Sequence, residues 1–247
     1  MATAIKLKNT SLPGSHPNIN TFVPALPAKN LKQYWLANSG ITTSDSDVTQ
    51  WDGFNGNNGV PGVPPEYIAS LAETSLPGVK FTLGDNLATG YAKPDGDGYF
   101  VIAARYDAIP ANSICAMGQG ELSSTTDRMY LGFYGIRACF AVADLGFGGD
   151  QRGTTTFSAG DLVVIGLHID GSTASLRVNG SVESSDTFTG GLGGGEVPFI
   201  IGGNPDDNGD WMYDQTAAGM AFYHGSMSGT QLDAIDAAMG ALLGISL

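Results

Sequence analysis

The sequence predicts an all-β protein of antiparallel strands with one short helix at its C-terminus. Two observations indicate this fold class: 36 of the 247 residues are Gly, and 19 Asp stand against only 5 Glu. Gly and Asp are typical of tight turns, whereas Glu is favoured in helices. A hydrophobic share of 42% argues against a disordered chain, and the Gly residues follow no collagen period.

Short apolar runs separated by turn residues begin at Leu31 and continue along the chain. The clearest part is residues 162–183, where every second residue between 163 and 169 is apolar. Asp170-Gly171 and Asn179-Gly180 then predict two tight hairpin turns. Three antiparallel strands in a meander are therefore expected here.

The middle strand of this meander alternates between a buried and a wet face. Ala174, Leu176 and Val178 form the predicted buried face, and Arg177 lies on the predicted wet face. Several other runs are apolar on both faces, as expected for interior strands of two stacked sheets. These further strand candidates are residues 79–83, 99–107, 113–117, 128–134, 137–143, 197–201 and 220–224.

The two ends of the chain differ from this pattern. Residues 1–30 contain Pro13, Pro17, Pro24 and Pro27 and have no sustained period, so they predict an extended N-terminal arm. Such an arm either lies across a neighbouring subunit of a homo-oligomer or packs along its own domain. The remaining residues, 31–247, form one predicted β domain.

The C-terminal tail predicts a helix. Ser228 and Gln231 have the spacing of a capping box. Asp233 and Asp236 lie near the helix start, where the macrodipole favours acidic residues. An apolar stripe at helical spacing should pack on the sheet; it consists of Leu232, Ile235, Met239 and Leu242.

Charge and hydropathy limit the expected partners and location. The net charge is −13 and no Lys/Arg cluster occurs, so nucleic acid is a disfavoured ligand. No signal peptide or membrane-spanning stretch is recognisable, so we expect a soluble chain that is not exported by a signal and binds no membrane. Cys115 and Cys139 lie in apolar runs and are interpreted as buried thiols, with a single disulfide as the alternative.

Several motifs in order resemble concanavalin A-like lectin/glucanase domains of the laminin-G-like kind, which occur in bacterial and phage proteins. The N-terminal motifs are Trp35, the polar run 42–47, the V-x-x-W element 48–51 and the loop 55–58. The later motifs are Leu176-Arg-Val-Asn-Gly180, Phe199-Ile-Ile-Gly-Gly203, an Asp/Asn loop, Gly219-Met-Ala-Phe-Tyr223 and the final helix. The resemblance covers residues 31–247 and implies an antiparallel two-sheet jelly-roll sandwich with one short C-terminal helix. Trp35 and Trp51 are then core residues.

Catalytic patterns are poorly represented in the sequence. The Glu-x-Asp-x-x-Glu strand motif of hydrolases with this fold is absent, and no two Glu residues share a strand at the spacing that a retaining glycosidase needs. A lyase would use a His as general base, and His168 and His224 are the candidates. We interpret both as ordinary strand residues and assign no catalytic residue.

The loop at residues 204–213, Asn-Pro-Asp-Asp-Asn-Gly-Asp-Trp-Met-Tyr, combines polar oxygens with aromatic rings. Aromatic rings stack on sugar rings while Asp and Asn bind the hydroxyls, so the candidate carbohydrate-binding residues are Asn208, Asp210, Trp211 and Tyr213. A Ca²⁺ ion is an alternative ligand, held by Asp206, Asp207 and Asp210. A solvated loop with Trp211 folded back onto the sandwich is the third interpretation. The turn 94–98 imitates the start of a calcium loop but is interpreted as a tight turn. No other cofactor is predicted.

The leading functional hypothesis is a non-enzymatic structural or adhesion protein of a virus particle, such as a bacteriophage decoration, fibre or tail component. It rests on the resemblance, the extended arm and the missing catalytic pair, and it places the protein in the virion, in contact with other virion subunits through the arm. A cell-surface glycan is the possible ligand. The alternatives are a carbohydrate-binding module and a polysaccharide-cleaving enzyme of the same fold.

Overall fold

A computed structural model gives the fold of the chain, and it describes residues 26–82, 84–92, 96–108, 113–119, 128–146, 151–189, 199–202 and 214–247. Residues 1–25 of the predicted arm lie outside the described residues. Residues 26–30 contact their own domain, where Leu26 packs at the C-terminal helix and the Asn30 side chain donates to the Ser226 carbonyl at 3.0 Å.

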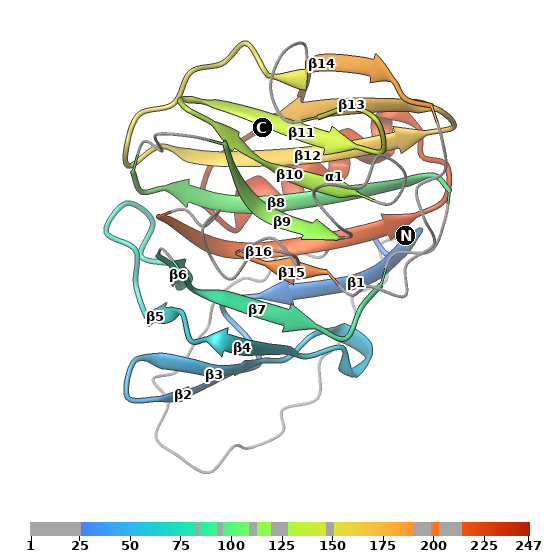
Figure 1. The fold of residues 1–247 in the computed structure, drawn as a ribbon. Helices are drawn as coiled ribbons and strands as arrows, with labels where there is room; N and C mark the ends of the chain where they lie inside the picture. The colour runs from blue at the N-terminus through green and yellow to red at the C-terminus, as the bar shows by residue number, and fades with distance from the viewer. Residues whose placement is uncertain are drawn as a thin grey trace, which may run out of the picture.

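The described part of the chain is predominantly β, with sixteen strands, one 3₁₀ turn and one α-helix (Figure 1). The first eight strands are β1 (Leu31–Leu36), β2 (Ile41–Ser44), β3 (Asp47–Trp51), β4 (Gly59–Val63), β5 (Glu66–Ile68), β6 (Gly78–Phe81), β7 (Asn86–Thr89) and β8 (Gly98–Tyr106), with the 3₁₀ turn η1 (Phe54–Gly56) after β3. The others are β9 (Ser113–Gln119), β10 (Met129–Tyr134), β11 (Arg137–Val142), β12 (Leu162–Asp170), β13 (Thr173–Val178), β14 (Ser181–Thr187), β15 (Ile200–Ile201) and β16 (Gln215–His224), followed by α1 (Gly229–Ala241).

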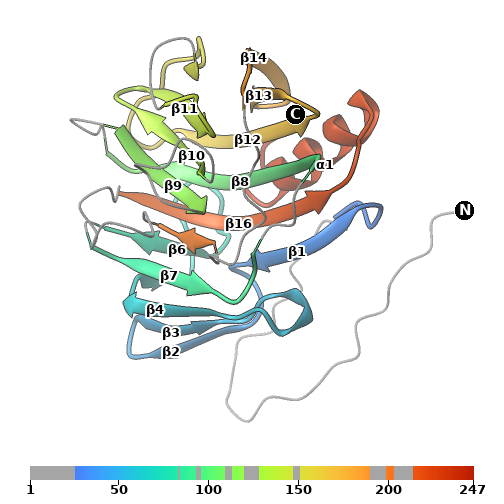
Figure 2. The ribbon, with the colours of Figure 1, turned by 45° about the vertical axis from the view of Figure 1, so that its right-hand side comes forward.

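The strands form one hydrogen-bonded antiparallel sheet that turns back on itself. Its order is β11-β10-β9-β15-β7-β4-β3-β5-β6-β16-β8-β12-β13-β14, with β1 beside β16 and β2 beside β3. What we call the front half consists of β11, β10, β9, β15, β7 and β4. The back half consists of β6, β16, β8, β12, β13 and β14, together with β1 (Figures 1 and 2). The strand β3 links the halves through single residue pairs with β4 and β5.

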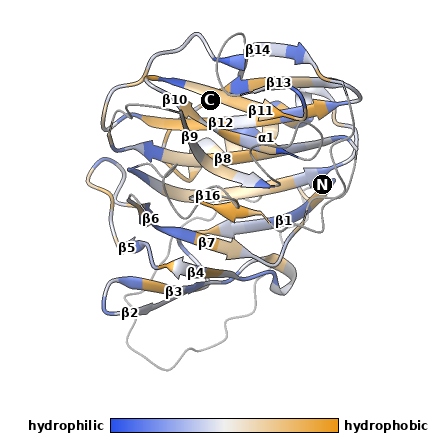
Figure 3. Ribbon diagram, in the orientation of Figure 1, coloured by the Kyte–Doolittle hydropathy of each residue, from blue (hydrophilic) through white to orange (hydrophobic). Residues whose placement is uncertain are grey.

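Aromatic side chains fill the space between the two halves. Phe199, just before β15, lies 4.5 Å from Phe222 of β16 between ring centroids, and Tyr106 of β8 lies 4.9 Å from Phe133 of β10. Hydrophobic residues follow the inner strands, whereas β14 at the margin is largely hydrophilic (Figure 3). Trp35 and Trp51 are fully buried in this core, which confirms the prediction for both.

The predicted meander of three strands is confirmed as β12, β13 and β14. Asn179 and Gly180 are the turn residues between the last two strands and have φ of 47° and 83°, the left-handed values that a type I′ turn requires. The first turn lies one residue later than predicted. Asp170 is still paired with Thr173, so Gly171 and Ser172 occupy its centre.

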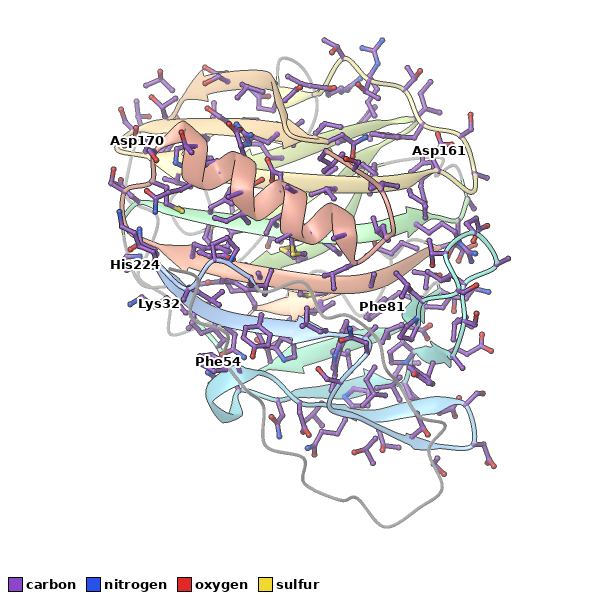
Figure 4. All side chains as sticks on the ribbon, turned by 180° about the vertical axis from the view of Figure 1, so that it is seen from behind. Lys32, Phe54, Phe81, Asp161, Asp170 and His224 are labelled. Atoms are coloured by element: carbon purple, nitrogen blue, oxygen red, sulfur yellow. The ribbon has the colours of Figure 1, made fainter. Side chains whose placement is uncertain are left out.

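The predicted C-terminal helix is confirmed as α1, including its capping box. The Ser228 side chain accepts from the Gln231 backbone, and the Gln231 side chain accepts in return from the Ser228 backbone. The helix lies on the outer face of the back half, against β8, β12 and β16 (Figure 4). It therefore covers the second apolar face of β8, which explains why that strand is apolar on both sides. Within the described ranges, no helix has the length and apolar character that a membrane crossing needs.

A buried polar network fixes the helix to the sheet. Asp236 of α1 is 1% exposed and accepts hydrogen bonds from the Tyr99 hydroxyl and from Arg177 Nε, the latter at 2.8 Å. Burial, followed by the Asp236 charge, raises the pKa of Tyr99 well above 10, so the phenol stays a donor. Gly166 is required beside this phenol, because a Cβ there would lie 2.1 Å from the hydroxyl oxygen.

The position of Arg177 corrects the sequence prediction. Strand alternation placed it on a wet face, but α1 covers that face and leaves Arg177 only 6% exposed. Its NH2 group also donates to Asp233 at 2.7 Å and to the Gly180 carbonyl at 2.7 Å. Two helix carboxylates therefore share one guanidinium, and they differ in burial.

This difference predicts unequal costs for two matched substitutions. Asp236→Ala leaves Arg177 buried without its main partner and should lower the free energy of unfolding by about 3 kcal/mol. Asp233→Ala removes a carboxylate whose side chain is 67% exposed, and it should cost less than about 1 kcal/mol. Urea denaturation of both variants measures the two values. Equal losses would contradict the assignment of Asp236 as the anchor of the helix.

Candidate functional site

The predicted sugar-binding loop follows β15 of the front half in the sequence and precedes β16 of the back half. Its candidate residues Asp206, Asp207, Asn208, Asp210, Trp211 and Tyr213 lie outside the described residues, but both ends of the loop are described. In the front half, Gly202 donates its N–H to the Ala116 carbonyl at 2.8 Å. In the back half, the Asp214 carbonyl accepts from the N–H groups of Asp107 and Ala108 at 2.9 and 3.3 Å. The loop is thereby anchored at the start of β16.

Charged and polar side chains surround this anchor, and we call Glu73, Arg105, Asp107 and Thr216 the rim cluster. Arg105 NH1 donates to Glu73 Oε2 at 2.9 Å, and its Nε donates to Asp107. Thr216 Oγ1 donates to the second Asp107 oxygen at 2.5 Å. The backbone and Arg105 hydrogen bonds lower the pKa of Glu73, which keeps this carboxylate ionised at neutral pH. The rim cluster is thus a set of mutually hydrogen-bonded polar side chains beside the start of β16.

Gln215, which the sequence did not predict as a site residue, has an unusual environment. It is the first residue of β16 and is 1% exposed, yet neither its Oε1 nor its Nε2 has a hydrogen-bond partner among the described residues. Its backbone pairs with Phe81 on one side and Tyr106 on the other. A buried amide without partners is costly, so Gln215 has both a donor and an acceptor to give to a hydroxyl group. The only sequence signal was a polar residue at the start of an apolar strand.

The two candidate histidines lie on different faces of the back half. His168 is on the face that α1 covers, with its ring edge-on to Tyr99 at 6.2 Å between centroids. His224 is on the same face of β16 as Met220 and Phe222, which point into the core between the two halves. His168 Nε2 and His224 Nδ1 are buried and have no hydrogen-bond partner in the part of the chain that the structure describes. Strand alternation therefore prevents the two imidazoles from sharing one catalytic site.

The turn at residues 94–98, which imitates a calcium loop, is described from residue 96 onward. Asp97 in this part of the turn has a structural role. Asp97 Oδ1 accepts the Gly171 N–H at 2.8 Å, and the Asp97 carbonyl accepts the Gly225 N–H at 2.8 Å. Asp97 thus ties two neighbouring hairpin ends together. No group of three or more His, Cys, Asp or Glu side chains with a metal-binding arrangement occurs among the described residues. Cys139 is a buried free thiol, as predicted, and the side chain of Cys115 is not described.

The fold is shared with several solved structures at low sequence identity. A Trypanosoma rangeli sialidase in complex with sialic acid matches 88% of this chain, with a TM-score of 0.59 and 13% identity. Domain 4 of AbnA, a GH43 extracellular arabinanase from Geobacillus stearothermophilus, in complex with arabinotriose, matches 84%, with a TM-score of 0.58 and 12% identity. The binding domain of Paraclostridial Mosquitocidal Protein 1 matches 83%, with a TM-score of 0.53 and 12% identity. Such likeness establishes a shared fold only.

The share of each matched structure that is covered differs. The matches cover 34% of the sialidase chain, 52% of the mosquitocidal chain and 98% of the arabinanase domain. This chain thus spans about a third of the sialidase it matches. No protein-family model matches the sequence, and no curated protein sequence matches it. Membership of the concanavalin A-like family therefore stays a prediction.

His168 is half-buried with its Nε2 shielded from solvent, and this predicts that stability depends on pH. Burial lowers the pKa of His168 below its ordinary 6.5, against the smaller opposing effects of Asp170 and Asp97. The unfolded chain then takes up a proton more readily than the folded chain, so this contribution to stability is complete above about pH 6.5 and is lost as the pH falls. His168→Phe, which keeps a ring against Tyr99, should flatten the curve of unfolding free energy between pH 5 and 7. Parallel curves for the parent and the variant would refute this assignment.

Proposed function

We propose that this chain is a carbohydrate-binding domain with a lectin-like jelly-roll fold, and that it binds a neutral oligosaccharide at the rim where residues 204–213 join β15 to β16. The observation that carries the proposal is the match to the arabinanase domain in complex with arabinotriose, of which 98% is covered. The whole of that domain thus resembles this chain in fold. This supports the carbohydrate-binding alternative over the virion role.

The chemistry at the rim supports the same site. The rim cluster presents the carboxylates of Glu73 and Asp107 and the Arg105 guanidinium on the outer face of the sheet. On the inner face, Gln215 adds an amide without a hydrogen-bond partner among the described residues. Trp211 and Tyr213 would supply the rings that stack on a sugar, with Asn208 and Asp210 as hydroxyl ligands. The net charge of −13 repels polyanions, so a neutral sugar is favoured over a uronate or a sialylated glycan.

Substitution of Trp211 tests the proposal directly. Trp211→Ala should abolish retention of the chain on immobilised neutral polysaccharides such as arabinan, xylan, mannan and glucan, because the stacking surface is lost. Trp211→Phe keeps a ring and should retain part of the binding. Both variants should melt within a few degrees of the parent. A large drop in melting temperature would instead identify Trp211 as a core residue.

Ca²⁺ binding by Asp206, Asp207 and Asp210 is a separate prediction for the same loop. A cation that binds only the folded chain raises the melting temperature with the logarithm of its concentration. Melting curves in Ca²⁺ and in excess chelator should then differ in the parent and coincide in Asp207→Asn. Identical curves for the parent would rule out a stabilising Ca²⁺ site.

The other functions remain predictions. A virion role depends on contacts between the N-terminal arm and other subunits. Residues 1–25 of this arm lie outside the described residues. Cleavage of a polysaccharide would need a base, and His168 and His224 are the candidates. Loss of reducing-end release on a polysaccharide panel after replacement of either His would support that activity.

A further inference from the structure

An exposed aromatic ring lies at the rim opposite to the polar loop. Phe54 of η1 stacks on Tyr34 of β1 with ring centroids 4.9 Å apart and an interplanar angle of 14°. Phe54 is 42% exposed, so one ring face lies on Tyr34 and the rest is open to solvent. Figure 4 labels Phe54 on one side of the molecule and Phe81, whose backbone pairs with Gln215 at the foot of the polar loop, on the other.

The turn that carries Phe54 is held rigidly against β1. Gln33 is fully buried and exchanges two hydrogen bonds with the half-buried Asn57: Asn57 Nδ2 donates to Gln33 Oε1 at 3.2 Å, and Gln33 Nε2 donates to the Asn57 carbonyl at 3.5 Å. Asn58 Oδ1 accepts the Gly53 N–H at 3.2 Å. These contacts fix the chain on both sides of Phe54, so the exposed ring is preorganised.

Close packing beneath the turn fixes its backbone as well. A Cβ on Gly53 would lie 2.6 Å from the indole nitrogen of the buried Trp35 and 2.1 Å from the Asn57 carbonyl oxygen. Only glycine fits there. The backbone at Gly53 therefore rests directly on the core, and Phe54, the next residue, is held outside it.

The surroundings of Phe54 suit a single sugar ring better than a protein partner. Its neighbours Asp52 and Gly56 are exposed, and Lys32 lies on the same side of the molecule (Figure 4). A stable protein interface buries about 800 Å² on each partner around an apolar centre, whereas one ring among polar groups matches one sugar. A sugar ring would stack on the open face of the Phe54 ring, beside the exposed polar residue Asp52.

We propose that Phe54, backed by Tyr34, is a second stacking platform for a neutral sugar, so that one chain holds glycan at two opposite rims. The inference rests on the proposed carbohydrate-binding function but uses a separate set of residues. Two sites on one rigid domain bind a polysaccharide more tightly than either site alone and can cross-link two chains of it.

Retention on the immobilised polysaccharide that binds the parent tests the platform. Phe54→Ala should weaken retention about tenfold through lost avidity. Val63→Ala is the matched control, because Val63 is 48% exposed against 42% for Phe54 but carries no ring, and its retention should equal that of the parent. Equal melting temperatures show that both variants are folded.

A fluorescent ring placed at the platform gives a second, independent measurement. Trp35 and Trp51 are buried, so Phe54→Trp combined with Trp211→Phe leaves one exposed indole, at the platform. Titration with the trisaccharide of the retained polysaccharide should shift its emission, and adding Tyr34→Ala should remove the shift. If the parent is retained but Phe54→Ala behaves as Val63→Ala and the emission does not shift, the platform is wrong and the proposed function stands. If no polysaccharide retains the parent, the proposed function itself fails.

Discussion

The packing of Phe199 against the back half of the sheet is the contact on which the rest of the structure depends. Its ring lies 4.5 Å from Phe222 and 5.5 Å from Phe100, so a front-half residue is locked to two back-half strands. Its backbone also exchanges hydrogen bonds with the chain around β7, through the N–H of Thr89 and the carbonyl of Tyr91. Because β15 has only two residues, these contacts of Phe199 set its place between β7 and β9.

That position of β15 determines where a ligand can bind. The strands β15 and β16 are consecutive in the chain, and β15 belongs to the front half while β16 belongs to the back half. The space between the halves is filled by large aromatic side chains, including Tyr106, Phe133 and Phe140, all of them almost fully buried. Because the interior is filled in this way, both proposed binding sites lie at the margins of the sheet.

Local signals in the sequence predicted much of the fold correctly. Asn179-Gly180 and the Ser228–Gln231 capping box act over a few residues, so their geometry could be read without tertiary information. Arg177 shows the limit of prediction from local signals. Alternation gives its face of the strand, but only the packing of α1 decides that this face is buried and that Asp236 accompanies it. The polar residues Gln33 and Gln215 were missed for the same reason, since their burial comes from strands distant in sequence.

The two rims differ in how binding would be organised, and this follows from how each is built. At the Phe54 rim, the Gln33–Asn57 amide pair and the close contact of Gly53 with Trp35 fix the ring before any ligand arrives. A preorganised ring loses little entropy on binding, so even one stacking contact can contribute affinity. At the other rim, the buried amide of Gln215 has no hydrogen-bond partner among the described residues, and a hydroxyl that reached it would relieve that cost. One rim thus favours binding through prior order and the other through an unsatisfied polar group, two physically independent ways for the same fold to hold a neutral sugar.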